Sequence, residues 1–345
     1  MKVAIVYPIE FGDDGHVGGG ERYARELARA LAEEVDTRLV TFGRRRERRQ
    51  EGRLRVEVYP RRWLVRGRLN NPFNPRFLGA LRDVDVIHCL AWHVLPTDLA
   101  ALYGKVSRKQ VIVTDQGGGA DVSLARILPM GRLVDRFLFV SRYAASRYPQ
   151  FARRAGVIYG GADVDRFSPA DVARKRQILF VGRLIPSKGI EQLIDAVDPD
   201  VPLLVIGRPY DPDYFADLKL RAAGRSVKFI TDASDADVVM AYRTSLVTVL
   251  PSWRDSELLG LVLLESMACA TPVICMAPGP EAEVVDHGTT GFVVPATDPE
   301  ALRATIGRFL ADPGLSDRLG KSARSRVTGR FTWQATAERC LAAYG

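Results

Sequence analysis

Two glutamates, Glu257 and Glu265, lie in a stretch, residues 251–276, that is predicted to contain a polar turn, a short helix and a strand. In an open α/β sheet, ligands bind at the carboxyl ends of the strands, and unpaired helix amides there, near Gly260 and Leu261, favour an anion such as a diphosphate. Ionised carboxylates only accept hydrogen bonds, so both glutamates suit vicinal sugar hydroxyls. The alternative interpretation is that Glu257 solvates a turn and Glu265 a helix face.

Two cations, Arg183 and Lys188, lie five positions apart in a loop that follows the predicted strand 178–181 and precedes a helix. Gly182 opens this loop. Side chains of this kind ahead of a helix N-terminus predict a compact cationic pocket for a diphosphate, although ordinary surface charge is the alternative. Arg208 follows another predicted strand, where we expect the crevice wall that contacts a nucleotide base.

Three glycines, Gly18, Gly19 and Gly20, separate the first predicted strand from the first helix. Glycines at such a turn let the backbone approach a ligand closely and direct amides at it. The spacing is not the dinucleotide-binding G-x-G-x-x-G pattern. A tight turn without a ligand explains the glycines about as well.

Three further polar residues follow predicted strands in the first half of the chain. His88 stands at the end of the strand 84–89 and is a candidate for hydrogen-bonding a sugar, although many such residues merely cap strands. Asp115 and Gln116 follow the strand 111–114. They are further candidate site residues at the same edge of the sheet.

The length of 345 residues favours two domains, because a single core rarely exceeds ~250–300 residues. Alternating strands and helices predict α/β domains with mainly parallel sheets. No apolar run approaches the ~20 residues of a membrane span, and the first apolar stretch is too short for a signal peptide. The four cysteines lack the close spacing of zinc ligands, so we expect reduced thiols in a cytoplasmic chain.

Positive charge is concentrated in the first half. Residues 1–160 carry 28 Lys and Arg against 17 Asp and Glu, whereas the remainder carries 21 against 24. Eleven arginines occur within residues 44–68, interleaved with aromatic residues. This pattern indicates an anionic partner, such as membrane head groups, a lipid-linked phosphate or nucleic acid, or else a solvated loop. A nucleic-acid partner is disfavoured, because no reader motif is present.

The pair Glu257 and Glu265, separated by seven residues and followed by MACATPVI, resembles the donor-site signature of the retaining group 1 glycosyltransferases (family four). The order of Arg183, Lys188 and these glutamates carries the resemblance, which extends from Gly18 to about Trp333. The aromatic residue usual before the glycine of this signature is replaced by leucine. A histidine present in many relatives is also missing from the loop that begins at Asp115.

The resemblance implies the GT-B fold, with two Rossmann-like domains of mainly parallel sheets facing across a cleft. Residues 1–160 would form the acceptor-side domain, with a C-terminal helix at about 331–345 packing back onto it, and 161–330 the nucleotide-sugar donor domain. The implied activity is retaining transfer of a sugar from a nucleotide-diphosphate sugar to a hydroxyl acceptor. Cell-envelope polysaccharide, glycolipid or other glycoconjugate synthesis is the expected setting.

The resemblance also implies roles for single residues. Arg183 and Lys188 would stabilise the departing diphosphate, Glu257 would hold sugar hydroxyls, and Glu265 would hold the ribose. The loop of Gly18, Gly19 and Gly20 would face the donor diphosphate and the acceptor.

Neither a metal nor a cofactor is expected, because cations and helix amides can neutralise a diphosphate, and the nucleotide sugar is a co-substrate. Asp-x-Asp pairs, which hold metals in other glycosyltransferases, occur five times and discriminate nothing. The acceptor is expected to be a carbohydrate or a lipid-linked molecule, and residues 44–68 predict peripheral binding to the inner face of the membrane. A non-catalytic sugar-nucleotide-binding protein of the same fold and a sugar-nucleotide epimerase remain the alternatives.

Overall fold

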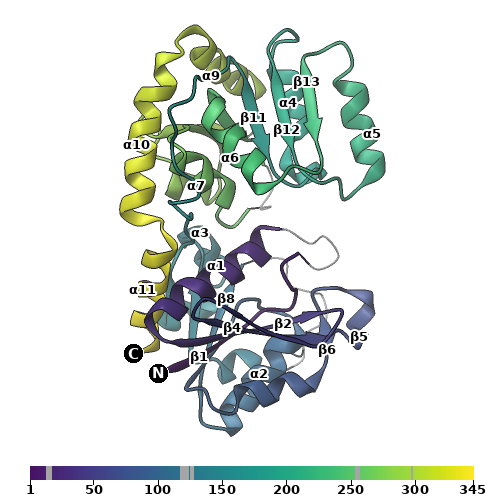
Figure 1. Ribbon diagram of the computed structural model, residues 1–345, viewed down its shortest axis with the longest axis vertical. Coiled ribbons are helices and arrows are strands. Elements are labelled where there is room, and N and C mark those ends of the chain that lie inside the picture. The colour runs from purple at the N-terminus through teal and green to yellow at the C-terminus, as the bar shows by residue number, and fades with distance from the viewer. Residues whose placement is uncertain (13–17, 117–123, 125–127, 253–256, 297) are drawn as a thin grey trace. The chain divides into compact units, whose positions relative to one another are not determined.

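A computed structural model describes residues 1–12, 18–116, 124, 128–252, 257–296 and 298–345. The chain forms two compact units. Met1–Gly160 together with Trp333–Gly345 form the N-terminal unit, and Gly161–Thr332 form the C-terminal unit. Each unit has helices packed on a mainly parallel sheet, which confirms the predicted α/β class (Figure 1).

The N-terminal unit contains an eight-stranded sheet in the order β10-β9-β8-β7-β1-β2-β4-β3, in which β3 alone among these strands is antiparallel to its neighbour. The sequence of β1 is almost entirely apolar, and its residues Val3, Ala4, Ile5 and Val6 are at most 1% exposed, as expected for the centre of a parallel sheet. The strands are β1 (Lys2–Val6), β2 (Asp36–Gly43), β3 (Glu47–Glu51), β4 (Leu54–Pro60), β7 (Val86–Cys89), β8 (Gln110–Asp115), β9 (Arg136–Phe139) and β10 (Ala155–Val157), with a separate ribbon of β5 (Trp63–Leu64) and β6 (Pro72–Phe73).

Helices cover this sheet because each buries one apolar stripe. In the first helix, Leu27, Ala28 and Leu31 are fully buried, in the spacing of one helical face. The edge of the Tyr23 ring meets the Trp333 ring at a centroid distance of 5.1 Å, so the last helix packs on the first. The helices are α1 (Gly19–Glu34), α2 (Leu95–Val106), α3 (Arg142–Ser146) and α11 (Trp333–Tyr344), with shorter turns η2 (Val65–Gly67), η3 (Pro75–Leu81), η5 (Met130–Leu133) and η6 (Pro149–Arg154).

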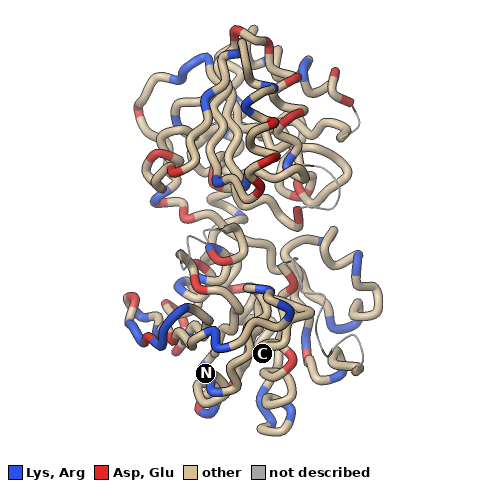
Figure 2. The backbone as a smooth tube through the Cα atoms, turned by 90° about the vertical axis from the view of Figure 1, so that its right-hand side faces the viewer, with Lys and Arg blue, Asp and Glu red and all other residues tan. Residues whose placement is uncertain are grey.

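Residues 44–68 do not form the solvated loop that was one interpretation of their sequence. They contain the antiparallel hairpin of β3 and β4 and strand β5 of the β5–β6 ribbon. Leu54, Val56 and Val58 are buried at every second position, which is the period of a strand with one face on the core. Lys and Arg residues are frequent in the unit that carries both chain termini (Figure 2).

The C-terminal unit contains a six-stranded, fully parallel sheet in the order β13-β12-β11-β14-β15-β16. The chain order reverses between β11 and β14, which creates a topological switch point where open α/β sheets bind their ligands. The strands are β11 (Ile178–Val181), β12 (Leu203–Ile206), β13 (Val227–Ile230), β14 (Val247–Leu250), β15 (Val273–Ala277) and β16 (Gly291–Pro295). The helices are α4 (Ile190–Ala196), α5 (Pro212–Arg221), α6 (Asp235–Thr244), α7 (Leu261–Ala268), α8 (Glu281–Val284), α9 (Pro299–Ala311) and α10 (Gly314–Arg330), with η7 (Pro186–Lys188).

Several aspartates of the Asp-x-Asp pairs stabilise helix ends. The Asp211 carboxylate accepts hydrogen bonds from two amides at the start of α5. Asp237 and Ser234 form a capping box at the start of α6. Asp211 and Asp237 therefore have structural roles at helix N-termini.

The four cysteines, Cys89, Cys269, Cys275 and Cys340, are buried and free. Within the described part of the chain, no helix is both long and apolar enough to cross a membrane.

Candidate functional site

The switch point of the C-terminal unit is built from the loops that follow β11 and β14. Gly189, at the end of the first loop, adopts a left-handed conformation with φ +65°, which disfavours any residue with a Cβ atom. A Cβ atom there would also collide with the carbonyl oxygen of Pro251 in the second loop. Glycine therefore allows the two loops to touch, and this contact brings their side chains together.

Lys188 and Glu257 meet at this contact as an ion pair between Nζ and Oε1. Ser252 also donates a hydrogen bond from Oγ to Oε1 of Glu257, at 3.2 Å. The Lys188 residue is 6% exposed, and a buried ammonium requires a partner of this kind. Glu257 therefore does more than solvate a turn.

Glu281, the first residue of α8, adds a carboxyl that the sequence did not single out as a site residue. It is 4% exposed. Burial, reinforced by the negative charge of Glu257, raises the pKa of Glu281 to about 8. The carboxyl of Glu281 is thus mainly protonated at pH 7, and the ion pair at this site is formed by Lys188 and Glu257. Glu281 lies within the extent of the resemblance, from Gly18 to about Trp333, which implied no role for it.

Gly260 sets the direction of α7. It precedes the helix with φ +77°, and a Cβ atom there would lie 3.2 Å from the side chains of Leu250 and Leu263. Leu261 is the first residue of the helix, as predicted.

Glu265 is 6% exposed, so the alternative that it solvates a helix face is wrong. The hydroxyl of Tyr242 donates to its Oε2 atom at 3.1 Å. Glu265 is therefore a buried carboxyl with a fixed orientation.

Arg183 and Arg208 are exposed side chains on adjacent loops. The amide of Gly182 donates to the carbonyl of Ile206 at 3.0 Å, and the carbonyl of Arg208 accepts from Leu184 at 2.9 Å, so the two loops are held together. The Arg183 guanidinium lies over the Tyr210 ring, 5.9 Å from its centroid. The structure therefore gives the buried Lys188 the partly exposed carboxylate of Glu257 as its partner and leaves Arg183 at the surface.

In the N-terminal unit, the predicted glycine turn leads directly into α1. Gly18 caps this helix without a side-chain hydrogen bond, and Gly19 and Gly20 are its first residues. A Cβ atom on Gly20 would collide with the Tyr7 hydroxyl and would lie 3.4 Å from Oε1 of Gln116. Glycine is therefore needed at position 20 for close packing.

Gln116 follows β8 beside this turn. Both of its side-chain polar atoms are buried, and neither has a hydrogen-bond partner among the residues that the structure describes. Asp115, the last residue of β8, is 5% exposed and accepts a hydrogen bond from Tyr148 at 2.7 Å. The glycines that follow Gln116 lie outside the described residues.

The interpretation of His88 as a sugar contact is wrong. Its side chain is fully buried within β7, and burial lowers its pKa to about 3. Nδ1 lies 2.7 Å from the Tyr344 hydroxyl and Nε2 lies 2.7 Å from the Thr114 hydroxyl. Both ring nitrogens are occupied by the protein, so His88 is a neutral core residue that ties α11 to the sheet.

Two family descriptions match nearly the whole chain between them. Residues 162–326 match "Glycosyl transferases group 1", and residues 17–166 match "Glycosyltransferase Family 4". The chain belongs to the group 1 glycosyltransferases. The paired Lys188 and Glu257 of the C-terminal unit lie within the first of these matches.

Curated relatives of this family agree. The chain is 34% identical over 219 residues to a D-inositol 3-phosphate glycosyltransferase of Frankia alni, across 55% of this chain and 53% of that protein. Over 404 residues it is 29% identical to the D-inositol 3-phosphate glycosyltransferase of Acidothermus cellulolyticus, with coverages of 98% and 87%. A GDP-mannose-dependent phosphatidylinositol monomannoside mannosyltransferase of Mycolicibacterium smegmatis is 29% identical, with coverages of 69% and 72%. The chain spans about half the length of the Frankia alni relative.

Solved structures support the GT-B fold. The structure of Anabaena HepE in complex with UDP and glucose matches with a TM-score of 0.80 and 19% identity, covering 99% of this chain and 98% of that one. Sucrose-phosphate synthase from Thermosynechococcus elongatus matches with a TM-score of 0.76 and 23% identity, with coverages of 100% and 98%. These similarities confirm the predicted fold of two Rossmann-like domains.

Proposed function

We propose that this protein is a retaining glycosyltransferase that moves a sugar from a nucleotide-diphosphate sugar to a hydroxyl acceptor. The observation that carries the proposal is the ion pair of the buried Lys188 with the partly exposed Glu257 at the switch point of the C-terminal sheet. An ammonium and a carboxylate held side by side provide one group for a leaving diphosphate and one for sugar hydroxyls. The family to which the chain belongs supports the same reaction.

In the proposed reaction, Lys188 and the exposed Arg183 neutralise the diphosphate as its bond to the anomeric carbon breaks. The acceptor oxygen then bonds to the same face of the sugar and its proton passes to the departing diphosphate, so the anomeric configuration is retained. Glu257 accepts hydrogen bonds from the transferred sugar, and the buried Glu265 accepts from the ribose. Because the cations and the N-terminus of α7 supply positive charge, we propose that transfer requires no metal or cofactor.

The acceptor is proposed to be a carbohydrate or a lipid-linked molecule used in glycoconjugate synthesis. Names of two relatives support this class, since one acts on D-inositol 3-phosphate and another on a phosphatidylinositol monomannoside. We further propose that residues 44–68 contact an anionic partner, such as the inner face of the cytoplasmic membrane. Their arginine content supports this partner.

The test is turnover of a panel of nucleotide sugars, with the anomeric configuration of the product read by NMR. A transferase should hydrolyse its donor slowly even without an acceptor. Donor binding without hydrolysis or transfer would favour the non-catalytic alternative, and inverted free nucleotide sugar would favour an epimerase. A product of inverted configuration at the new glycosidic bond would refute retention. Loss of activity on addition of a metal chelator would refute metal independence.

A further inference from the structure

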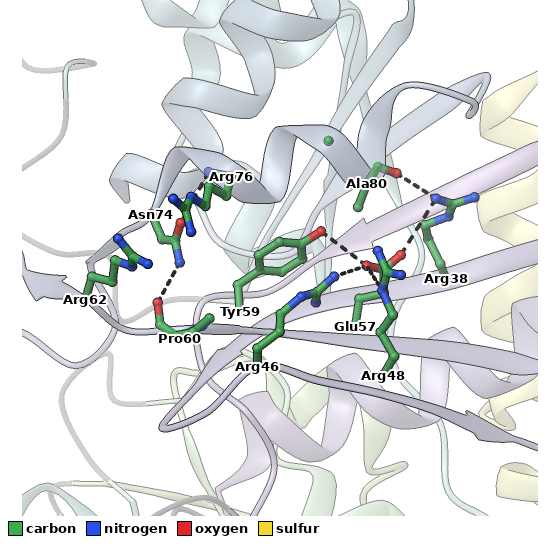
Figure 3. A pocket seen from close by; sticks show the side chains of 11 residues that line it. Arg38, Arg46, Arg48, Glu57, Tyr59, Pro60, Arg62, Asn74, Arg76 and Ala80 are labelled. Carbon is green, nitrogen blue, oxygen red and sulfur yellow. Dashed lines mark hydrogen bonds and ion pairs between the residues drawn. The ribbon is translucent and has the colours of Figure 1, made fainter.

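A cavity of about 490 Å³ in the N-terminal unit is lined by residues of β2, β3, β4 and η3. Its charged lining is strongly one-sided, with five arginines and one glutamate: Arg38, Arg46, Arg48, Arg62, Arg76 and Glu57. Figure 3 shows these side chains around the Tyr59 ring. None of the candidate site residues discussed above lines this cavity, which we call the arginine pocket.

Three arginines at one end of the arginine pocket share a single carboxylate. Glu57 lies 2.7 Å from Arg46, 3.2 Å from Arg48 and 3.9 Å from Arg38. Arg38 is further paired with Asp83 at 2.8 Å, outside the lining. Three guanidinium groups therefore share two carboxylates, which leaves an excess of positive charge at this end of the pocket.

Elsewhere on the same hairpin, Arg49 shares Glu51 with Arg25 and Arg29, but Glu10, Glu47 and Glu26 also take part, so carboxylates outnumber arginines in that cluster. Arg49 contacts Glu10 at 2.5 Å, Glu51 at 2.9 Å and Glu47 at 3.1 Å. The protein can thus balance a hairpin arginine fully. The charge imbalance is local to the arginine pocket and is not a general property of the hairpin.

The other end of the pocket holds two guanidinium groups with no acidic partner among the residues that the structure describes. Arg62 and Arg76 flank the side chain of Asn74 (Figure 3). Asn74 is itself fixed, because it donates to the Pro60 carbonyl at 2.8 Å and accepts from the Arg76 amide at 3.2 Å. Each guanidinium offers five N–H donors in a planar fork, and here these donors are open to a ligand.

One wall of the pocket is already oriented for a ligand. Arg46 donates to the Val58 carbonyl at 2.9 Å and lies over the Tyr59 ring, 3.9 Å from its centroid. These contacts fix the guanidinium before any ligand arrives, so less conformational entropy is lost on binding. A cavity of this volume falls within the ~300–1,000 Å³ range of small-molecule sites.

We propose that the arginine pocket binds a phosphate monoester. Such a group carries a charge of about −1.5 to −2 at pH 7 and three strong acceptor oxygens, which match paired guanidinium forks. A polynucleotide requires an extended stripe of positive charge, whereas the arginines of this pocket form a compact cluster that suits a small dianion. This inference narrows the anionic partner proposed for residues 44–68 and rests on that part of the proposed function, not on sugar transfer.

The phosphate can belong to a soluble molecule or to a lipid head group. Trp63 follows Arg62 directly, is 72% exposed and stacks on Phe73 at a centroid distance of 6.1 Å. An exposed tryptophan beside arginines is typical of a contact with the membrane interface. Trp63 therefore provides a way to separate the two sources.

The experiment is calorimetric titration of the full chain with glycerol 3-phosphate at low salt, without any nucleotide sugar. We expect saturable binding that is at least about 10-fold weaker in the double variant Arg62→Gln/Arg76→Gln. The matched control is Arg45→Gln/Arg66→Gln, which removes the same charge from exposed positions of the same segment outside the pocket. The control should bind like the wild type.

Absence of binding to the wild type, or equal weakening in both double variants, would overturn the proposal. The source is read from flotation with phosphatidic acid vesicles and with phosphatidylcholine vesicles. Selective binding to phosphatidic acid that glycerol 3-phosphate displaces and Trp63→Ala weakens supports a lipid head group. Calorimetric binding without flotation supports a soluble phosphate monoester. Neither the calorimetry nor the flotation uses a nucleotide sugar. Failure of phosphate binding can therefore be distinguished from failure of sugar transfer.

Discussion

Replacing Glu281 with glutamine should stabilise the protein, and the gain should grow with pH. In the folded protein the carboxyl is 4% exposed, and burial followed by repulsion from Glu257 raises its pKa from 4.5 to about 8. The unfolded chain releases this proton near pH 4.5, whereas the folded chain holds it until about pH 8. Stability of the wild type is therefore lost as pH rises through this window.

The size of the effect follows from the shift. One pKa unit corresponds to about 1.36 kcal/mol, so the shift from 4.5 to about 8 corresponds to at most roughly 5 kcal/mol. Glutamine has the same shape without a titrating proton. We therefore expect the free energy of unfolding of Glu281→Gln to be close to that of the wild type at about pH 4. Above about pH 8 it should be several kcal/mol larger.

Urea unfolding across this pH range measures the difference. Glu300→Gln, at an exposed position of α9, is the control for removing a carboxyl in general. A stability gain for Glu281→Gln that does not change between acid and alkaline pH would refute the interpretation of Glu281 as a buried, neutral acid.

Two further predictions concern the supporting structure. Gly260→Ala places a Cβ atom on a residue with left-handed backbone and should lower the free energy of unfolding in urea by roughly 1–2 kcal/mol. The control Gly307→Ala, in α9 with open space around it, should raise it by a few tenths to about 1 kcal/mol. Equal effects would contradict the conformational argument. His88 has a depressed pKa, so its contribution to stability is present above about pH 6.5 and is lost as pH falls toward about 3. The variant His88→Gln should be less stable than the wild type at neutral pH but should lose less stability on acidification. An unchanged dependence of stability on acid pH would speak against a buried neutral imidazole.

The C-terminal unit illustrates what local sequence can predict. Apolar strands followed by polar loops placed Lys188 after β11 and Glu257 after β14, and parallel strands bring such loops to one edge of a sheet. Gly260 also stands directly before α7, where the backbone adopts a left-handed φ that favours glycine. These features depend on short stretches of chain, so their residue types already indicate them.

Features that depend on distant residues could not be predicted. The partner of His88 is Tyr344, 256 positions away, and only the folded chain shows that the imidazole points inward. The acidity of Glu281 depends on its burial next to Glu257. The hairpin of β3 and β4 did have a local signal, the alternation of Leu54, Val56 and Val58, but the arginines between them dominate the composition.

The proposed sugar transfer depends most directly on the pair of Lys188 and Glu257. Removing Lys188 alone would leave the Glu257 carboxylate without its partner, so the decisive variant is Lys188→Ala/Glu257→Ala, which removes both charges. The matched control is Lys321→Ala, at an exposed position of α10.

With the donor identified from the panel, single-turnover transfer is measured for these variants after their unfolding has been shown to match the wild type. We predict that the double variant loses at least the roughly 2–4 kcal/mol, or about 30- to 1,000-fold in rate, that one charged transition-state contact supplies. The control should transfer at the wild-type rate. Transfer by a folded double variant at the wild-type rate would contradict the central claim.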